Sequence, residues 1–244
     1  MPQHPDLRGK LALITGASRG IGEAIALGLA RAGAHVILVA RTAGALEELD
    51  DKIQKEGLEP ATLVPFDLND GNAIDRLGAV VAERWGKLDI LVGNAGALGE
   101  LMPLTHMTVK DWDALININL NANWRLLRAF DPLLRAADNG RAIFVTSGAA
   151  RKSKAYWGPY AITKAALEKM VETYAAEVQN ITNVRANLLD PGPMRTRMRA
   201  SAMPGEDPMS LPHPEEIIPL VNHMASEACD ESGKLFKFSE WPET

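Results

Sequence analysis

Three side chains in the second half of the sequence have the types and spacing needed for proton transfer. Tyr160 and Lys164 are four positions apart, so on a helix they share a face and their polar ends can converge. A phenol is a poor acid or base at neutral pH, and we expect a nearby ammonium to stabilise the phenolate and lower its pKa. Ser147 follows an apolar run and supplies a hydroxyl that can polarise a carbonyl oxygen. These residues predict general acid/base chemistry.

Tyr156 is a second tyrosine near the same helix start, but position 160, four residues on, is not a lysine. We expect Tyr156 and Trp157 either to wall a substrate pocket or simply to pack. An isolated tyrosine and lysine with the spacing of Tyr160 and Lys164 are usually a tyrosine that faces the core and a lysine on the surface, with no catalytic role. A nucleotide-type loop upstream and Ser147 favour the functional interpretation here.

That loop is Thr15-Gly16-Ala17-Ser18-Arg19-Gly20-Ile21-Gly22, which connects an apolar run directly to a helical pattern. Glycines let the backbone turn and a diphosphate approach, while the free N–H groups and dipole of a helix N-terminus favour negative charge. A glycine-rich turn alone is more often only a turn. At the first strand–helix connection of a parallel sheet it predicts nucleotide binding.

The elements that must position these residues follow from the hydrophobic pattern, which alternates short apolar runs with amphipathic segments. We predict strands at residues 10–15, 35–40, 61–66, 89–93, 141–146, 184–189 and 234–238. We predict helices at residues 21–31, 43–56, 71–85, 108–137 with a break near 117–121, 160–180 and 215–226. The alternation predicts an α/β fold, a Rossmann-type doubly wound parallel sheet in three α/β/α layers.

Composition fits a single domain over residues 1–244, because 46% of residues are hydrophobic and 23% are charged. The net charge of -5 argues against a nucleic-acid partner. Cys229 is the only cysteine, so no intramolecular disulfide is possible, and no metal-ligand spacing surrounds it. No run approaches the ~18 apolar residues of a membrane span. We expect a cytoplasmic protein with no metal and no membrane partner.

Further motifs occur in a fixed order along the chain. Asn94-Ala95-Gly96 follows the fourth strand, Asn119 lies in Ile118-Asn119-Leu120, and Pro191-Gly192 with Thr196 follows the sixth strand. With Ser147, Tyr160-Ala161-Ile162-Thr163-Lys164 and the T-G-x-x-x-G-x-G spacing of the loop, the sequence resembles the short-chain dehydrogenase/reductase family from Leu7 to about Gly233.

The resemblance implies that Ser147 and Tyr160 hold the substrate oxygen, that Tyr160 donates or removes the proton, and that a nicotinamide cofactor carries the hydride. It implies that Lys164 also bonds the nicotinamide ribose. Asn119 would hold a water that relays protons to Lys164. Other asparagines lie close by in the sequence, but only Asn119 matches the family position.

The cofactor positions implied by the resemblance are Gly16, Ser18, Arg19, Gly20, Ile21, Gly22, Arg41, Asp67, Leu68, Asn94, Ala95, Gly96, Tyr160, Lys164, Pro191, Gly192, Met194 and Thr196. Asp67 and the backbone of Leu68 would contact the adenine, and Asn94 would lie beside the adenosine ribose.

Charge at the end of the second strand bears on which cofactor binds. Relatives that use NAD place an acidic residue there, whereas this chain has Ala40 followed by Arg41. Arg41 and Arg19 would give charge-assisted contacts to one phosphate, so the sequence favours NADP(H). The alternative is that Arg41 is a solvated residue at a helix start.

We therefore predict an NADP(H)-dependent oxidoreductase that interconverts a carbonyl and a secondary alcohol on a fairly apolar small molecule. The alternatives are an NAD(H)-dependent alcohol dehydrogenase and a non-catalytic nucleotide-binding regulatory protein. A sugar-nucleotide epimerase or dehydratase also uses this tyrosine–lysine spacing, but 244 residues leave no room for its larger substrate domain.

By family position, residues 193–214 form an irregular lid over the substrate, and its arginines Arg195, Arg197 and Arg199 either hold an acidic substrate or face solvent. The run from Met198 to Pro208 is similar to a bacterial branch of the family whose substrates are largely unassigned. The resemblance also implies a homodimer or homotetramer. The chain lacks the glycine-rich end that many members have after the last strand.

Overall fold

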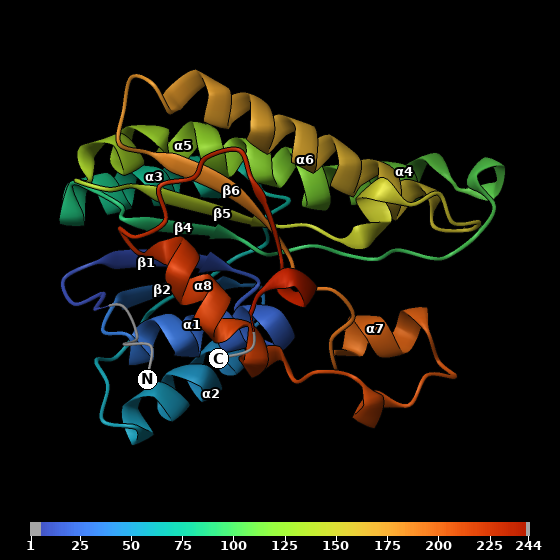
Figure 1. Cartoon of the computed structure of the whole chain (residues 1–244), viewed down its shortest axis with the longest axis horizontal. Helices are drawn as coiled ribbons and strands as arrows, with labels where there is room; N and C mark the ends of the chain where they lie inside the picture. Colours follow the sequence, from blue (N-terminus) through green and yellow to red (C-terminus); the bar gives the residue numbers. More distant parts are fainter. Residues whose placement is uncertain (1–5, 243–244) are drawn as a thin grey trace.

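A seven-stranded parallel sheet runs through the middle of the structure, a computed structural model that describes residues 6–242 (Figure 1). Its strands are β1 (Leu11–Thr15), β2 (His35–Ala40), β3 (Thr62–Pro65), β4 (Ile90–Gly93), β5 (Arg141–Val145), β6 (Arg185–Asp190) and β7 (Leu235–Lys237). Their order is β3-β2-β1-β4-β5-β6-β7, so the direction of winding reverses between β1 and β4. In such sheets ligands bind outside the carboxyl ends of the strands at that point.

Helices cover both faces of the sheet (Figure 1). One face carries α1 (Gly20–Arg31), α2 (Ala43–Lys55) and α8 (Ile218–Ala225), and the other carries α3 (Gly71–Trp85), α5 (Ala122–Ala136) and α6 (Gly158–Val178). The shorter helices are α4 (Val109–Ile116) and α7 (Arg197–Ala202). The predicted three-layer fold is confirmed. None of the helices described is long and apolar enough to cross a membrane.

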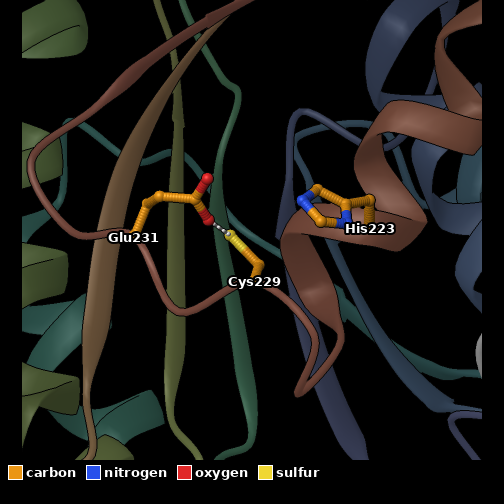
Figure 2. Close-up of side chains that lie close together, drawn as sticks. All are labelled: His223, Cys229 and Glu231. Atoms are coloured by element: carbon orange, nitrogen blue, oxygen red, sulfur yellow. Dashed lines mark hydrogen bonds between the residues drawn. The ribbon is translucent and has the colours of Figure 1, made fainter.

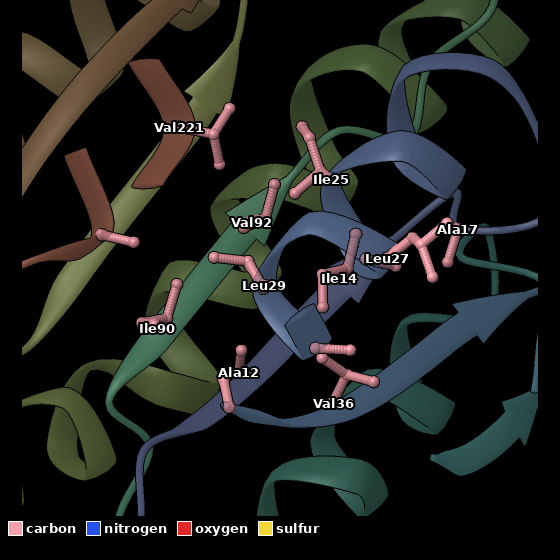
Figure 3. Packing of buried hydrophobic residues seen from close by; sticks show 14 of the residues in the cluster. Ala12, Ile14, Ala17, Ile25, Leu27, Leu29, Val36, Ile90, Val92 and Val221 are labelled. Carbon is pink, nitrogen blue, oxygen red and sulfur yellow. The ribbon is translucent and has the colours of Figure 1, made fainter. Parts of the chain in front are cut away.

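The core divides into two clusters because successive strand residues point to opposite faces. On β1, Ala12 and Ile14 belong to the cluster beneath α1, whereas Leu11 and Leu13 belong to the cluster beneath α3, α5 and α6. Figure 3 shows the first cluster, in which Ile25 and Leu29 of α1 pack against aliphatic side chains of the strands. A sheet covered on both faces explains why its strands are continuous apolar runs.

Two helix predictions need correction. The asparagine-rich segment Asn117–Asn121 is a π-helical turn that joins α4 to α5 instead of a break. The side chain of Asn123 donates to the backbone carbonyl of Asn119 at 2.8 Å, within this turn. The last predicted helix divides into a 3₁₀ turn, Pro214–Ile217, and α8, because Pro219 lacks an N–H and favours a helix start.

We expect Phe144→Ala to lower the free energy of unfolding by about 3–5 kcal/mol, because large-to-small changes in a core leave a cavity. Phe144 lies on β5, fully buried, in the same strand that leads to Ser147. Urea denaturation followed by circular dichroism measures the change. Val80→Ala on α3 is the control, since Val80 is 53% exposed and should change stability by less than about 0.5 kcal/mol. Equal losses in the two variants would contradict the core described here.

Candidate active site

The residues predicted to carry the chemistry meet at the carboxyl edge of the sheet. Ser147 follows β5, Tyr160 and Lys164 lie in the first turns of α6, and Asn119 lies in the π turn. Gly96 lies between two of these residues, Asn119 and Lys164, and shows how close together they are. A Cβ atom on Gly96 would lie 3.0 Å from Oδ1 of Asn119 and 3.5 Å from Nζ of Lys164. The fold therefore brings together residues that are far apart in the sequence.

Lys164 carries its ammonium into the protein interior, where the residue is 4% exposed. Its Nζ donates to the backbone carbonyl of Val145 at 2.9 Å, at the end of β5. Burial lowers the pKa of Lys164 to about 8, and the negative charge of Glu168 opposes this effect. The group is thus mostly protonated at neutral pH but lies close to its titration range.

Tyr160 is also buried, at 8% exposure. Burial raises the pKa of Tyr160, the neighbouring Ser147 hydroxyl opposes the rise, and the charge of Asp190 adds to it. The net shift of this pKa is therefore upward, opposite to the predicted lowering. The Lys164 ammonium is bonded to Val145 and lies 5.9 Å from the centre of the Tyr160 ring, so loss of water around the phenol dominates.

Asn119 is fully buried, and its side chain is held by protein groups. Its Oδ1 accepts from the backbone N–H of Ala97 at 2.8 Å. Its Nδ2 donates to the carbonyl of Ala97 at 2.9 Å and to Oγ1 of Thr163 at 3.0 Å. Asn119 therefore ties the loop after β4 to the start of α6. The predicted water held by Asn119 stays a prediction.

Ser147 has two roles in the structure. Its Oγ accepts from the backbone N–H of Ala149 at 3.2 Å, which caps the 3₁₀ turn Gly148–Arg151 (η3). The same hydroxyl lies near the Tyr160 phenol and opposes the rise in its pKa. The cap therefore fixes the position of the hydroxyl beside the Tyr160 phenol.

The glycine loop lies between β1 and α1, with Ile21 and Gly22 in the first turn of the helix. Gly16 and Gly20 have φ values of 65° and 58°, which L side chains rarely adopt. A Cβ atom on Gly22 would collide with the carbonyl oxygen of Gly16 and with the Asn94 side chain. α1 has no side-chain cap at Arg19, so its first N–H groups are open to an anion.

Thr15 is a positioning residue that the sequence analysis missed. Its Oγ1 donates to the carbonyl of Val92 at 3.2 Å and accepts from the backbone N–H groups of Asn94 at 3.0 Å and Ala95 at 3.1 Å. The Asn94 side chain in turn donates to the carbonyl of Thr15 at 2.8 Å. The two loops at the reversal point of the sheet are therefore bonded to each other. The sequence signals for this role are a hydroxyl at the end of a buried strand and the place of Thr15 at the start of the glycine motif.

The residues predicted to face the adenosine end lie in the segments that follow β1, β2 and β3. Arg19 and Arg41 are exposed, and within residues 6–242 neither forms an ion pair. Asp67 is exposed, with Oδ1 accepting from both nitrogens of Asn69 at 3.0 Å, while Leu68 is buried. Two unpaired guanidinium groups at the carboxyl ends of strands suit a phosphate group.

The segment after β6 approaches the glycine loop. The backbone N–H of Gly192 donates to Oδ1 of Asp190 at 3.0 Å, Pro191 is buried, and Met194 is 2% exposed. Thr196 caps α7 by accepting from the N–H of Arg199 at 3.2 Å. Its methyl group would lie 3.4 Å from a Cβ on Gly20. This segment therefore lies against the glycine loop.

The predicted irregular lid at residues 193–214 contains regular structure, namely α7 and the 3₁₀ turn Pro208–Ser210. Arg199 pairs with Glu206 through two hydrogen bonds. Arg195 donates to the carbonyls of Pro208 at 3.0 Å and Leu211 at 3.2 Å. These two arginines therefore hold the segment together, which leaves the exposed Arg197 as the arginine open to solvent or substrate.

The loop before α6 holds the two other aromatic residues singled out above. Tyr156 is 59% exposed and has a positive φ of 73°. Trp157 is half-buried, and its ring lies edge-on to that of Tyr160 with 6.2 Å between centres. Trp157 therefore packs beside Tyr160, whereas Tyr156 points to solvent.

One group of potential metal ligands occurs within residues 6–242, formed by His223, Cys229 and Glu231 (Figure 2). Burial raises the pKa of Cys229 to about 12, and its thiol donates to Oε2 of Glu231 at 3.6 Å. The neighbouring Ser226 carbonyl binds Arg141 at the amino end of β5. The group therefore lies at the edge of the sheet opposite the candidate site and has no part in it.

Comparison with known proteins identifies the family. A sequence model described as short chain dehydrogenase matches residues 10–207, and the chain belongs to this family. An oxidoreductase of Escherichia coli K12, YciK, is 37% identical over 90% of this chain and 87% of its own length, and is described as uncharacterized.

Solved structures agree with this assignment. A short chain dehydrogenase from Pseudomonas syringae superposes with a TM-score of 0.94 at 34% identity, covering 97% of both chains. A short chain dehydrogenase from Escherichia coli CFT073, complexed with NADPH, has a TM-score of 0.92 at 34% identity, covering 97% of this chain and 99% of its own. The chain is thus an oxidoreductase of the short-chain family, of the branch whose substrates are largely unassigned.

We predict that Thr15→Val lowers the free energy of unfolding by about 2 kcal/mol or more, because it leaves the N–H groups of Asn94 and Ala95 without their acceptor. Chemical denaturation measures the loss. Thr173→Val is the matched control, because the Thr173 hydroxyl is exposed and donates only to the Lys169 carbonyl within α6. A loss no larger than that of the control would show that Thr15 does not hold the two loops together.

Proposed function

We propose that the protein is an NADP(H)-dependent oxidoreductase that interconverts a carbonyl and a secondary alcohol, with Tyr160 as general acid/base. The observation that carries the proposal is the convergence of Ser147, Tyr160 and buried Lys164 beside a glycine loop whose helix has no side-chain cap. A scaffold that only bound nucleotide would have no use for an ammonium buried next to a phenol.

The residues present fit a dinucleotide with a 2′-phosphate. The uncapped N-terminus of α1 would hold the diphosphate, and Arg19 and Arg41 would hold the extra phosphate. The NADPH complex of the Escherichia coli CFT073 relative supports this choice of cofactor. When bound, the nicotinamide would accept or supply the hydride.

Side chains of the protein would then supply the proton that the carbonyl oxygen needs. With its pKa raised by burial, Tyr160 keeps its proton at neutral pH and can donate it to a carbonyl oxygen as that oxygen gains negative charge. The Ser147 hydroxyl would donate to the same oxygen. Lys164, largely protonated below its pKa of about 8, would stabilise the phenolate that remains.

The lid segment, residues 193–214, and the Trp157 ring beside Tyr160 would border the substrate. The lid carries Met198 and Met209, which are 39% and 73% exposed, and such flexible apolar side chains suit a fairly apolar small molecule. A homodimer or homotetramer remains our expectation for the assembly.

Arg41→Ala should weaken NADPH binding by about ten- to a hundred-fold and change NADH binding by less than about two-fold. The reason is that a hydrogen bond to a charged group contributes about 1.5–3 kcal/mol and NADH lacks the 2′-phosphate. Fluorescence titration with both nucleotides measures the two affinities.

Arg84→Ala is the control, because Arg84 lies in the last turn of α3, over the Trp85 ring, away from the carboxyl ends of the strands. If Arg41→Ala weakened the binding of NADPH and NADH equally, Arg41 would not be the residue that contacts the 2′-phosphate.

Tyr160→Phe should reduce kcat for NADPH-dependent ketone reduction by about 10²–10⁴-fold, the range of general acid catalysis, and leave NADPH affinity within about three-fold. Steady-state absorbance at 340 nm and the same binding titration measure the two effects. Tyr174→Phe controls for loss of a phenol from the same helix, because the Tyr174 hydroxyl donates to Asp131. Full activity in the Tyr160 variant would refute the assigned role.

A further inference from the structure

A cluster of three charged side chains lies beside the predicted catalytic residues, and no sequence motif marks it. Tyr160, Lys164 and Glu168 follow one another at four-residue intervals on α6, so Glu168 lies one turn beyond Lys164 on the same face. Asp190 ends β6, immediately before Pro191 and Gly192. Arg151 ends η3, four residues after Ser147.

The Arg151 guanidinium joins the two carboxylates. One of its terminal nitrogens, Nη1, donates to Oε1 of Glu168, and the other, Nη2, donates to Oδ2 of Asp190. Each carboxylate has a second backbone or hydroxyl donor. Glu168 Oε1 accepts from Oγ1 of Thr146 at 2.7 Å, and Asp190 Oδ1 accepts from the N–H of Gly192 at 3.0 Å. One side chain thus connects the end of β5, the catalytic helix and the loop after β6.

Burial makes these contacts energetically important. The side chain of Glu168 is 12% exposed and that of Asp190 is 8% exposed, while that of Arg151 is 31% exposed. Two carboxylates that are this far removed from water need a compensating cation. Arg151 is the cation that contacts both of them.

The same carboxylates act on the two groups that would handle the proton. The charge of Glu168 raises the pKa of Lys164 against the larger effect of burial. The charge of Asp190 adds to the burial that raises the pKa of Tyr160. The charged groups that face these two residues are therefore Glu168 from α6, Asp190 from β6 and, through them, Arg151 from η3.

We propose that Arg151 is a positioning residue whose guanidinium clamps Glu168 to Asp190, fixes the Ser147 segment, α6 and the Pro191–Gly192 loop relative to one another, and neutralises the carboxylates beside Lys164 and Tyr160. The catalytic consequence of this proposal rests on the proposed function. The effect of the Arg151 charge on the neighbouring side chains requires neither cofactor nor substrate. We call Arg151, Glu168 and Asp190 the Arg151 clamp.

The test is the titration of Lys164, followed by NMR in protein labelled with ¹³C at the lysine side chains, with the Lys164 signal assigned from its loss in Lys164→Met. Arg151→Gln removes the compensating charge, so the pKa of Lys164 should rise by about 0.5–1 pH unit. Glu168→Gln removes the carboxylate that faces Lys164, so the same pKa should fall. In the variant that carries both Arg151→Gln and Glu168→Gln, the pKa of Lys164 should return toward the wild-type value or fall below it.

Arg135→Gln is the matched control, because Arg135 pairs with Asp131 on the surface of α5 and faces neither Lys164 nor Tyr160. It should leave the pKa of Lys164 unchanged. Arg151→Lys keeps the charge but loses the planar guanidinium whose two terminal nitrogens each bond one carboxylate, so it should bring the Lys164 pKa back toward the wild-type value while thermal stability stays lower.

The outcomes separate this proposal from the proposed function. If the pKa of Lys164 stays within about 0.2 units of the wild-type value in both Arg151→Gln and Glu168→Gln, the Arg151 clamp has no electrostatic role and the proposal is wrong, even if thermal stability falls. NADPH-dependent turnover measured in the same proteins tests the proposed function. Its absence in the wild type would contradict the oxidoreductase activity and leave the Lys164 result standing.

Discussion

The buried ammonium of Lys164 is the constraint on which the rest of the site depends. A cation removed from water is costly unless protein groups receive it, and here the carbonyl of Val145 does so at 2.9 Å. That contact joins α6 to the end of β5, so the helix that carries Tyr160 and the strand that leads to Ser147 cannot move independently. Burial also brings the Lys164 pKa down to about 8, near the range in which a proton relay is useful.

The neighbouring polar contacts act as supports for this arrangement. Asn119 ties the loop after β4 to Thr163, in the turn between Tyr160 and Lys164. Thr15 ties the same loop to the end of β1 and hence to the glycine loop. The site is therefore built from loops that follow adjacent parallel strands, and each loop is fixed by a side chain from another element. Such bonding favours a preorganised site.

The sequence predicted the sheet well because buried parallel strands are continuous apolar runs. The bounds of β2 and α3 match the predicted ones, and the glycine loop lies where its spacing indicated. The pKa of Tyr160 moves opposite to the expected direction, since its burial depends on three-dimensional packing that four-residue spacing does not contain. Arg151 was also missed, because its partners lie 17 and 39 positions away in the sequence. The interruption of the long helix at Asn117–Asn121 was predicted in place, but weak helix propensity could not show that it is a π turn.

The most direct test of the central claim is a crystal structure of the protein grown with NADP⁺. The account predicts that the diphosphate lies at the N-terminus of α1, the 2′-phosphate contacts both Arg19 and Arg41, and the nicotinamide ribose contacts Tyr160 and Lys164. A dinucleotide whose 2′-phosphate faces neither arginine, or whose nicotinamide lies away from Tyr160, would contradict the account.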